Sequence, residues 1–358
     1  MSSKNLFLIG SSHHSVPLEI REKLALSADD TEYIYNFLKE SKNISEFLVL
    51  NTCNRVELYG VSDKEDIQEE VTQLLSQLHD FDTAFYKRYS FWKRDLEVIR
   101  HIFEVASGID SQIIGENEIF GQVKDAFREA TENKTLGSTL NKVFQKSFQA
   151  AKWIRSNTSI CRGQISIGSI CVNLASRIFG SLEENNVLVV GTGEVAEKTL
   201  EALQAKGCSM YSVTGRNIEK SRNLANLYNG SVIDFETFQN SLSIFDIIIS
   251  STSASGLILS EQSIRKAVLK RKGLPVFLID LAVPRDVDPK SANLGSVFLY
   301  NMDDLSMIAN ENLKNRQNEV VTCKESIQEK ATYLWEGMNR ISQKKSSPIL
   351  HEPQEFHA

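Results

Sequence analysis

One stretch decides the fold of much of this chain: Asn186-Val187-Leu188-Val189-Val190-Gly191-Thr192-Gly193-Glu194-Val195-Ala196. Its first half is a continuous apolar strand, and a glycine-rich turn and a helix follow. A second strand is expected over Met210–Thr214, so the order strand, turn, helix, strand predicts the βαβ unit of a dinucleotide-binding fold. We expect a dinucleotide to contact Gly191, Thr192, Gly193, Glu194, Val195 and Ala196. The alternative is a domain of this fold that packs in the same way but binds nothing.

The end of the second strand predicts which dinucleotide is bound. An NAD site usually places Asp or Glu there to bond the ribose 2′-hydroxyl. Here Val213-Thr214-Gly215-Arg216-Asn217 contains no acid. Arg216 can pair bidentately with a 2′-phosphate, and Lys220 follows one helical turn later. NADP(H) is therefore favoured over NAD(H), and the alternative is an arginine that is simply exposed at a helix start. Further strands over Phe245–Ser251 and Val276–Asp280 would complete a parallel sheet.

Residues 1 to about 160, before this unit, alternate strand-like and helix-like segments, which predicts an α+β domain. Strands are expected over Leu6–Gly10, Phe47–Leu50, Val56–Tyr59 and Ala84–Phe91, and helices over Asp29–Lys39, Gln68–Leu78, Leu96–Ala106 and Ser138–Asn157. Residues 302–344, after the unit, read as one helix of roughly 60 Å that must pack against something. Its apolar stripe consists of Val320, Cys323, Ile327, Ala331, Leu334, Met338 and Ile341.

Length and composition set the frame for these segments. A chain of 358 residues with 41% hydrophobic and 24% charged residues is typical of a globular protein with two or three domains. We expect a catalytic domain over 1–160, a dinucleotide domain over 161–298, a long helix over 299–345 and a disordered tail over 346–358. A net charge of −6 argues against broad, non-specific nucleic-acid binding but does not exclude a local basic face.

The five scattered cysteines form no CxxC pair and no His/Cys cluster with metal spacing, so we expect free thiols and no metal site. Because no signal-peptide core and no apolar run long enough for a membrane helix appear, the protein is expected to be cytoplasmic.

A candidate nucleophile lies in Asn51-Thr52-Cys53-Asn54-Arg55-Val56-Glu57-Leu58-Tyr59, directly after an apolar strand. At the end of a strand, a side chain such as that of Cys53 can reach a cleft. Arg55 can supply positive charge, which favours the thiolate over the thiol, and the thiolate is the nucleophile. The alternative is a buried and inert cysteine.

Several separate segments, in the right order, resemble the glutamyl-tRNA reductase family. They cover roughly residues 5 to 345, and outside the dinucleotide unit they are residues 10–17 (Gly-Ser-Ser-His-His-Ser-Val-Pro) with Arg21-Glu22, the Thr52–Tyr59 run, residues 101–111 and 115–124, Asp280–Asp286, and Tyr300–Leu305. The resemblance implies an oxidoreductase that uses NADPH to reduce the glutamate of glutamyl-tRNA(Glu) to glutamate-1-semialdehyde, the first step of the C5 route to tetrapyrroles. Because an α-amino aldehyde is unstable in water, transfer to the downstream aminomutase is a further expectation, which the sequence by itself leaves open.

The resemblance also implies residue roles. Cys53 would attack the aminoacyl ester and hold the glutamyl group as a thioester, with His101 as a base or orienting group. Arg55 would hold the glutamate carboxylate, and Glu116 would bind the α-amino group. The substrate pocket would be lined by Thr52, Asn54, Arg55, Ser111, Glu116, Asn117, Glu118 and Gln122.

This chain departs from the family pattern at two places. Where the family usually shows Gly-Glu-Pro-Gln, this chain has Gly115-Glu116-Asn117-Glu118, and Glu118 adds negative charge beside the expected pocket. The region that joins two subunits in the family is short here, which leaves homodimer formation undecided. Two other functions stay open: an NADP-dependent dehydrogenase of a small free acid, similar to shikimate dehydrogenase, and a weakened homologue with a regulatory role.

Overall fold

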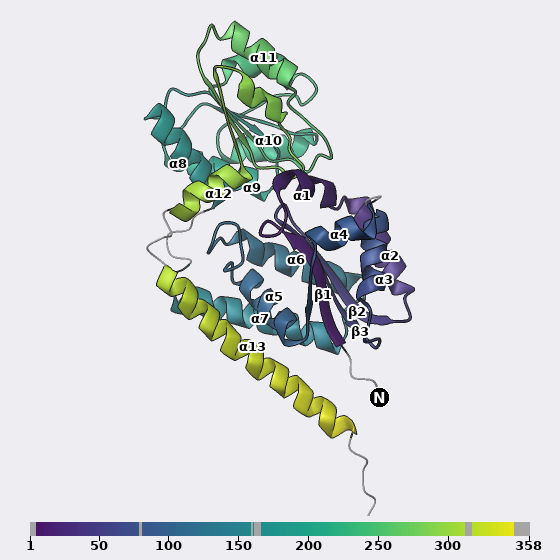
Figure 1. Ribbon diagram of the computed structural model, residues 1–358. Helices are drawn as coiled ribbons and strands as arrows, with labels where there is room; N and C mark the ends of the chain where they lie inside the picture. Colours follow the sequence, from purple (N-terminus) through teal and green to yellow (C-terminus); the bar gives the residue numbers. More distant parts are fainter. Residues whose placement is uncertain (1–4, 79–80, 159, 161–165, 312–316, 347–358) are drawn as a thin grey trace, which may run out of the picture.

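The computed structural model describes residues 5–78, 81–158, 160, 166–311 and 317–346. These residues form two α/β lobes, and a long helix lies along the N-terminal one (Figure 1). The predicted fold class is confirmed: an α+β lobe comes first, a parallel-sheet lobe follows, and the long helix comes last.

The N-terminal lobe is built on an antiparallel sheet of order β2-β3-β1-β4. Its strands are β1 (Asn5–Ser12), β2 (Ile44–Asn51), β3 (Arg55–Ser62) and β4 (Phe91–Arg94). β1 and β3 pair along their whole length, with Asn5 opposite Ser62 and Ser12 opposite Arg55. This register brings the segment after β1 beside the hairpin turn before β3, and the backbone N–H of His13 donates to the carbonyl of Asn54 (2.9 Å).

Helices cover both faces of this sheet, because alternate side chains of each strand point to opposite faces. Leu6, Leu8 and Tyr59 face the core made with α5, α6 and α7, whereas Phe7 and Ile9 face α2 and α3. The helices of this lobe are α1 (Leu18–Leu24), α2 (Ala28–Lys39), α3 (Gln68–Leu78), α4 (Thr83–Tyr89), α5 (Leu96–Ala106), α6 (Glu118–Glu132) and α7 (Ser138–Asn157).

The strand expected over Ala84–Phe91 is wrong, because α4 occupies most of it and β4 begins only at Phe91. The side chain of Asp82 caps this helix by accepting from the backbone N–H of Phe85 (2.6 Å). The Phe85 ring also packs on that of Tyr89, four residues later, with centroids 4.8 Å apart. The aromatic residues that suggested a strand therefore stabilise a helix.

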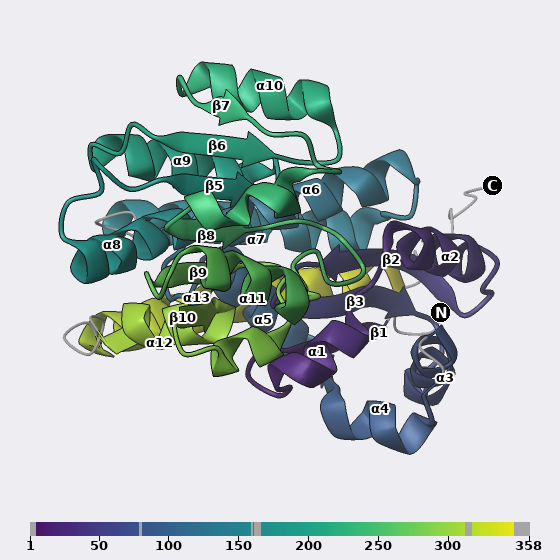
Figure 2. The ribbon, with the colours of Figure 1, turned by 90° about the horizontal axis from the view of Figure 1, so that it is seen from above.

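The second lobe is a six-stranded parallel sheet of order β10-β9-β8-β5-β6-β7 (Figure 2). Its strands are β5 (Val187–Val190), β6 (Tyr211–Thr214), β7 (Ser231–Val232), β8 (Ile247–Ser250), β9 (Val276–Asp280) and β10 (Val297–Asn301). The chain order reverses at β5, which pairs with β6 on one side and β8 on the other. Ligands of such sheets bind at the carboxyl ends of the strands beside that point.

The helices of the second lobe are α8 (Ile167–Phe179), α9 (Glu194–Ala205), α10 (Ile218–Leu227) and α11 (Glu261–Lys270), with two short 3-10 helices over Phe238–Ile244 and Pro289–Asn293. The sheet extends through β10 to Asn301, past the boundary expected at 298. No helix within the described ranges combines the length and the apolar character that a membrane crossing requires.

The structure gives two helices for the single rod expected over 302–344: α12 (Met302–Glu311) and α13 (Gln317–Ser346). Residues 312–316, between them, lie outside the described residues, as do the expected tail from 347 onward and the side chain of Ile341. The two helices pack on different lobes. Leu305 of α12 lies in the core of the second lobe, and Ile327 of α13 lies in the core of the first.

Helix α1 lies where the two lobes meet (Figure 1). The Arg285 guanidinium, in the second lobe, donates to both oxygens of Glu22 (2.8 and 2.6 Å). The neighbouring Arg21 donates to Asp303 Oδ1, at the start of α12 (2.5 Å). Two successive residues of α1 therefore hold the lobes together beside the space that they enclose.

Candidate active site

Cys53 lies in the hairpin turn that joins β2 to β3. The hydroxyl oxygen of Thr52 accepts hydrogen bonds from the backbone N–H groups of Asn54 (3.2 Å) and Arg55 (3.1 Å). The Thr52 N–H in turn donates to the Arg55 carbonyl (2.9 Å). These bonds close the turn locally, so the half-buried Cys53 thiol lies at the tip of a well-ordered hairpin.

The hairpin forms one wall of a cavity of about 230 Å³, which we call the cysteine cavity. Its lining includes most of the substrate residues predicted from the sequence, namely Thr52, Cys53, Asn54, Arg55, Ser111, Glu116, Glu118 and Gln122. The opposite wall comes from the second lobe and includes Val195, residues 251–253 and residues 281–283. Cys53 therefore faces the lobe that carries the glycine-rich turn.

That turn lines a second cavity of about 430 Å³, which we call the dinucleotide cavity. Gly191 has a φ of +119°, and a Cβ at this position would lie 2.5 Å from the Ser251 carbonyl oxygen, so only glycine fits. Gly193 precedes α9 and faces open space, which leaves room for a pyrophosphate at the helix N-terminus. Thr192 and the exposed Arg216 also line this cavity.

A polar turn, Ser251–Ser253, lines both the cysteine cavity and the dinucleotide cavity. Buried Asp286 fixes it by accepting from the Thr252 hydroxyl (2.5 Å) and the Thr252 N–H (2.9 Å). Among the described residues that line both cavities, Ser251 has a buried hydroxyl without a hydrogen-bond partner. This hydroxyl and the glycine cradle fit a nicotinamide dinucleotide, which Arg216 and the glycine-rich turn would hold.

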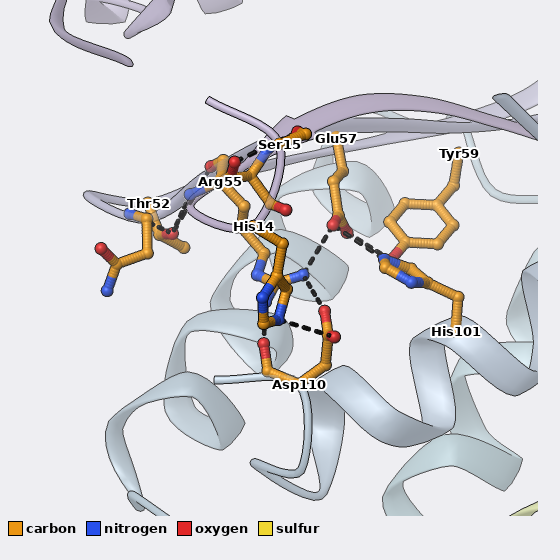
Figure 3. A network of polar contacts seen from close by, with 10 residues as sticks. His14, Ser15, Thr52, Arg55, Glu57, Tyr59, His101 and Asp110 are labelled. Carbon is orange, nitrogen blue, oxygen red and sulfur yellow. Dashed lines mark hydrogen bonds and ion pairs between the residues drawn. The ribbon is translucent and has the colours of Figure 1, made fainter. Parts of the chain in front are cut away.

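Behind the cysteine cavity lies a buried polar network (Figure 3). Arg55 Nη1 donates to Glu57 Oε1 (2.7 Å) and to Asp110 Oδ2 (3.0 Å), and Nη2 donates to the Asp110 carbonyl. His101 Nε2 lies 2.8 Å from Glu57 Oε1, and the Tyr59 hydroxyl donates to Glu57 Oε2 (2.6 Å). His101 does not line the cysteine cavity. It is connected to the cavity wall by hydrogen bonds, from His101 to Glu57 and from Glu57 to Arg55.

Neighbouring groups set the charge state of Glu57. Burial by itself would raise the pKa of Glu57, but His101 and Arg55 outweigh burial and lower that pKa to about 2. The guanidinium of Arg55 lies between two carboxylates, those of Glu57 and Asp110. Its Nε atom is buried without a partner among the described residues.

Arg55, which was predicted to supply positive charge to Cys53, is paired with Glu57 and Asp110. Burial raises the pKa of the Cys53 thiol to about 12, and the Glu116 and Glu118 carboxylates add to this effect. The cation that opposes the rise is Arg21, which donates to Asn54 Oδ1 (2.9 Å). Cys53 is therefore a thiol in the protein without substrate.

Glu118, the departure from the family pattern, faces the second lobe. Its carboxylate lies 3.8 Å from Lys198 Nζ, and Lys198 also pairs with Glu194 (2.6 Å). The added negative charge therefore has a cation from α9 beside it. Burial and the nearby Glu118 raise the pKa of Glu116 to about 7.

The remaining predicted residues lie outside the cavity expected for them. Asn117 precedes α6 and does not line the cysteine cavity. Glu194, Val195 and Ala196 do not line the dinucleotide cavity: Glu194 pairs with Lys198, Val195 lines the cysteine cavity, and Ala196 packs in the core.

Sequence reasoning also missed residues. Arg21 lies within a resembling segment but was given no role, and residues 251–253 were given none beyond the end of the expected strand at Ser251. A buried arginine in a short helix gives no local signal, because its partners Asn54 and Asp303 are distant in the chain. Gly215, Asn217, Phe235 and Ile258 complete the lining of the dinucleotide cavity.

The fold and these two cavities define a dinucleotide-dependent oxidoreductase with a cysteine beside its cofactor site. Residues 9–158 match the family model "Glutamyl-tRNAGlu reductase, N-terminal domain", and residues 173–308 match "Shikimate / quinate 5-dehydrogenase". The chain belongs to the glutamyl-tRNA reductase family.

Three relatives show the extent of this similarity. The chain is 38% identical to the glutamyl-tRNA reductase of Sulfurihydrogenibium sp. (strain YO3AOP1), over 98% of this chain and 79% of the relative. It is also 38% identical to that of Aquifex aeolicus, over 97% of this chain and 84% of the relative. The solved structure of the enzyme from Methanopyrus kandleri is 32% identical, with a TM-score of 0.53, over 96% of this chain and 82% of that one.

Proposed function

We propose that this protein reduces the glutamyl group of glutamyl-tRNA(Glu) to glutamate-1-semialdehyde with NADPH, in tetrapyrrole biosynthesis. The observation that carries this function is the half-buried Cys53 in a cavity whose far wall, Ser251–Ser253, is shared with the dinucleotide cavity. An acyl group on Cys53 Sγ would lie between the two lobes. Reduction of an acyl group to an aldehyde requires this juxtaposition of an acyl carrier and a hydride donor.

In the first step, Cys53 Sγ bonds to the acyl carbon and the ester C–O bond breaks. The thiol proton ends on the ribose hydroxyl of the released tRNA, so atoms and charge balance. The ammonium group of the substrate, paired with Glu116, cancels a negative charge that raises the pKa of Cys53. Substrate binding thereby favours the thiolate at the moment when it is needed.

The second step reduces the thioester. NADPH, when bound, supplies the hydride, and Arg216 with the glycine-rich turn would hold its phosphates. After hydride transfer to the acyl carbon, the C–S bond would break as the aldehyde C=O forms, the aldehyde and the oxidised dinucleotide would leave, and the Cys53 sulfur would take a proton from solvent to become a thiol again. Asp286 acts as a positioning residue, because it fixes the turn between the two cavities. His101 is also proposed to act by position, since it holds Glu57 against Arg55.

The positions of these residues indicate which part of the chain carries each function. We assign residues 1–160 to catalysis and substrate recognition and the part from 161 through the end of β10 at Asn301 to NADPH binding, with α12 and α13 as the connecting helices. The described cysteines are free thiols, which supports a reducing, cytoplasmic compartment. Because an α-amino aldehyde is unstable in water, direct transfer to the downstream aminomutase belongs to the same proposal.

The test is Cys53→Ser with charged tRNA. A serine hydroxyl without an activating base is a far weaker nucleophile, so aldehyde formation should fall by at least about a thousandfold. Mass spectrometry of wild type mixed with glutamyl-tRNA, without NADPH, should show a glutamyl adduct on the peptide that contains Cys53. Cys208→Ser, at a buried cysteine of the second lobe, is the control and should keep both adduct and turnover.

If Cys53→Ser keeps more than a few per cent of wild-type turnover, the reaction does not pass through a thioester on Cys53. Reduction of a free small acid in place of glutamyl-tRNA would favour the dehydrogenase alternative. An intact fold with neither adduct nor aldehyde would favour the regulatory alternative.

A further inference from the structure

A third cavity, of about 670 Å³, adjoins the cysteine cavity on the side away from the dinucleotide cavity. It lies between the segment after β1, the segment after α5, and helices α12 and α13. Ser111 and Gln112 line both this cavity and the cysteine cavity. The three cavities therefore form a series, with Cys53 in the central one.

The chemistry of the first step requires a place for the leaving group. The acyl group of the substrate is an ester of the terminal ribose, so a nucleoside lies one bond away from the carbon that Cys53 attacks. The cysteine cavity, of about 230 Å³, is smaller than the roughly 300–1,000 Å³ typical of small-ligand sites and suits the glutamyl group alone. A larger cavity of about 1900 Å³, between α5, α7 and α13, shares no lining residue with the cysteine cavity. Of the two cavities that do share lining residues with it, the dinucleotide cavity holds the glycine-rich turn, so the third cavity is the one assigned to the nucleoside.

We propose that this third cavity binds the 3′-terminal adenosine of the charged tRNA. The proposal rests on the proposed function and adds a subsite to it. Its volume lies within the range of sites that bury a molecule of nucleoside size. The shared wall at Ser111 and Gln112 would let the ester bond span the junction between the two cavities.

The lining offers a partner for each part of a nucleotide. The His14 ring is 58% exposed and is held by Asp110 Oδ1, 3.2 Å from His14 Nε2, so a base can stack on an oriented ring (Figure 3). Asp303 Oδ1 accepts from Arg21 and Gln112 (both 2.5 Å). No described group bonds to Asp303 Oδ2, and a carboxylate oxygen is the usual acceptor for a ribose hydroxyl.

Lys324, exposed on α13, lies on the wall of the same cavity and can pair with the phosphate of that nucleotide. A matched residue is available on the same helix. Lys330 lies two turns later, against the Trp153 ring (4.2 Å), and does not line this cavity. Comparing Lys324 with Lys330 therefore separates the local effect of Lys324 in this cavity from the general attraction of positive charge for RNA.

The experiment compares two labelled oligonucleotides, the trinucleotide CCA and the dinucleotide CC, by fluorescence anisotropy without NADPH. Wild type should bind CCA at least about tenfold more tightly than CC, because one stacked base is lost in CC. His14→Ala should remove most of that difference, and Lys324→Gln should weaken CCA severalfold. Lys330→Gln should leave the CCA-to-CC ratio unchanged. Since His14 and Lys324 are exposed, these variants should fold, and NADPH binding checks this.

Equal binding of CCA and CC by wild type would overturn the proposal. So would a His14→Ala variant that has the same ratio of CCA affinity to CC affinity as wild type. A loss of the same size in Lys324→Gln and Lys330→Gln would show non-specific phosphate binding only. Adduct formation on Cys53 from 2′(3′)-O-glutamyl-adenosine separates the two proposals. If wild type forms no adduct with any glutamyl ester, the proposed function fails. If it forms one whose half-saturating concentration is unchanged in His14→Ala, only the adenosine site fails.

Discussion

At the scale of single residues, the surroundings of Cys53 favour the thiol over the thiolate, because burial and two carboxylates raise its pKa to about 12. The thiolate is the form that oxidants and alkylating agents attack. In the proposed mechanism, the substrate ammonium therefore has to lower this pKa before Cys53 reacts.

Glu116→Gln tests this explanation. Removing the negative charge favours the thiolate, so the pKa of Cys53 should fall by about one unit and alkylation by iodoacetamide at pH 8 should become about tenfold faster. In wild type the rate should rise about tenfold per pH unit between pH 8 and 10. Glu129→Gln, at an exposed position of α6, the helix that begins two residues after Glu116, should alkylate like wild type. Equal rates in Glu116→Gln and wild type would show that Glu116 does not set this pKa.

Arg216 is the residue proposed to select the cofactor. Arg216→Asp places a carboxylate where the 2′-phosphate of NADPH is expected and offers an acceptor for the 2′-hydroxyl of NADH. The ratio of kcat/KM for NADPH over NADH should fall by at least about tenfold, the loss of one charge-assisted contact. Arg222→Asp, at an exposed position of α10 outside the cavity, is the control. A ratio that stays at the wild-type value would remove Arg216 from this role.

At the scale of elements, the short helix α1 has more influence on the site than its length suggests. Arg21 bonds both to Asn54, next to the nucleophile, and to Asp303 at the start of α12. Glu22 receives three hydrogen bonds from Arg285, one of them from its backbone N–H (2.7 Å). The element that supports the cysteine hairpin therefore also holds the dinucleotide lobe against it.

Glu22→Gln should loosen this contact and slow only the step that needs both lobes. Loss of a partly buried, bidentate charge pair should reduce the rate of thioester reduction by about tenfold. The rate at which tRNA is released in the absence of NADPH should stay within twofold of wild type. Rapid-quench measurements of tRNA release and of thioester reduction decide this. Glu32→Gln, at an exposed position of α2, is the control. Equal slowing of both steps would point to damage of the cysteine hairpin instead.

At the scale of the whole molecule, α13 completes the N-terminal lobe. The buried face of this helix consists of Cys323, Ile327, Ala331 and Leu334, and it packs with α5 and α7 in one core. The apolar stripe is therefore covered by the chain itself. It does not present a free seam for a second copy over the described residues.

Leu334→Glu should accordingly destabilise the folded lobe. Burying an unpaired carboxylate costs about 3 kcal/mol or more, so the midpoint of urea unfolding should fall clearly. Tyr333→Glu, at the neighbouring and 79% exposed position, should change stability by less than about 0.5 kcal/mol. Sedimentation of both variants at micromolar concentration provides the second readout. Dissociation of a dimer without loss of stability in Leu334→Glu would mean that the stripe is an interface between subunits.

The sequence by itself predicted the features that depend on neighbouring residues. The strand and glycine turn around Gly191, the two strands that flank Cys53, and most cavity residues of the 111–122 segment were all foreseen. The strands and the glycine turn follow from periodicity and turn chemistry, which act over a few residues, whereas the cavity residues of the 111–122 segment were implied by the resemblance to the family.

Only the tertiary structure decided which charges meet. The sequence placed Arg55 beside Cys53, but folding brings Asp110 to the guanidinium and leaves Arg21 as the cation near the thiol. It brings Lys198 to Glu118 and divides the expected rod into α12 and α13, which pack on different lobes. The physical reason is that charge pairing and burial depend on groups far apart in the chain, and no local pattern encodes which of them become neighbours.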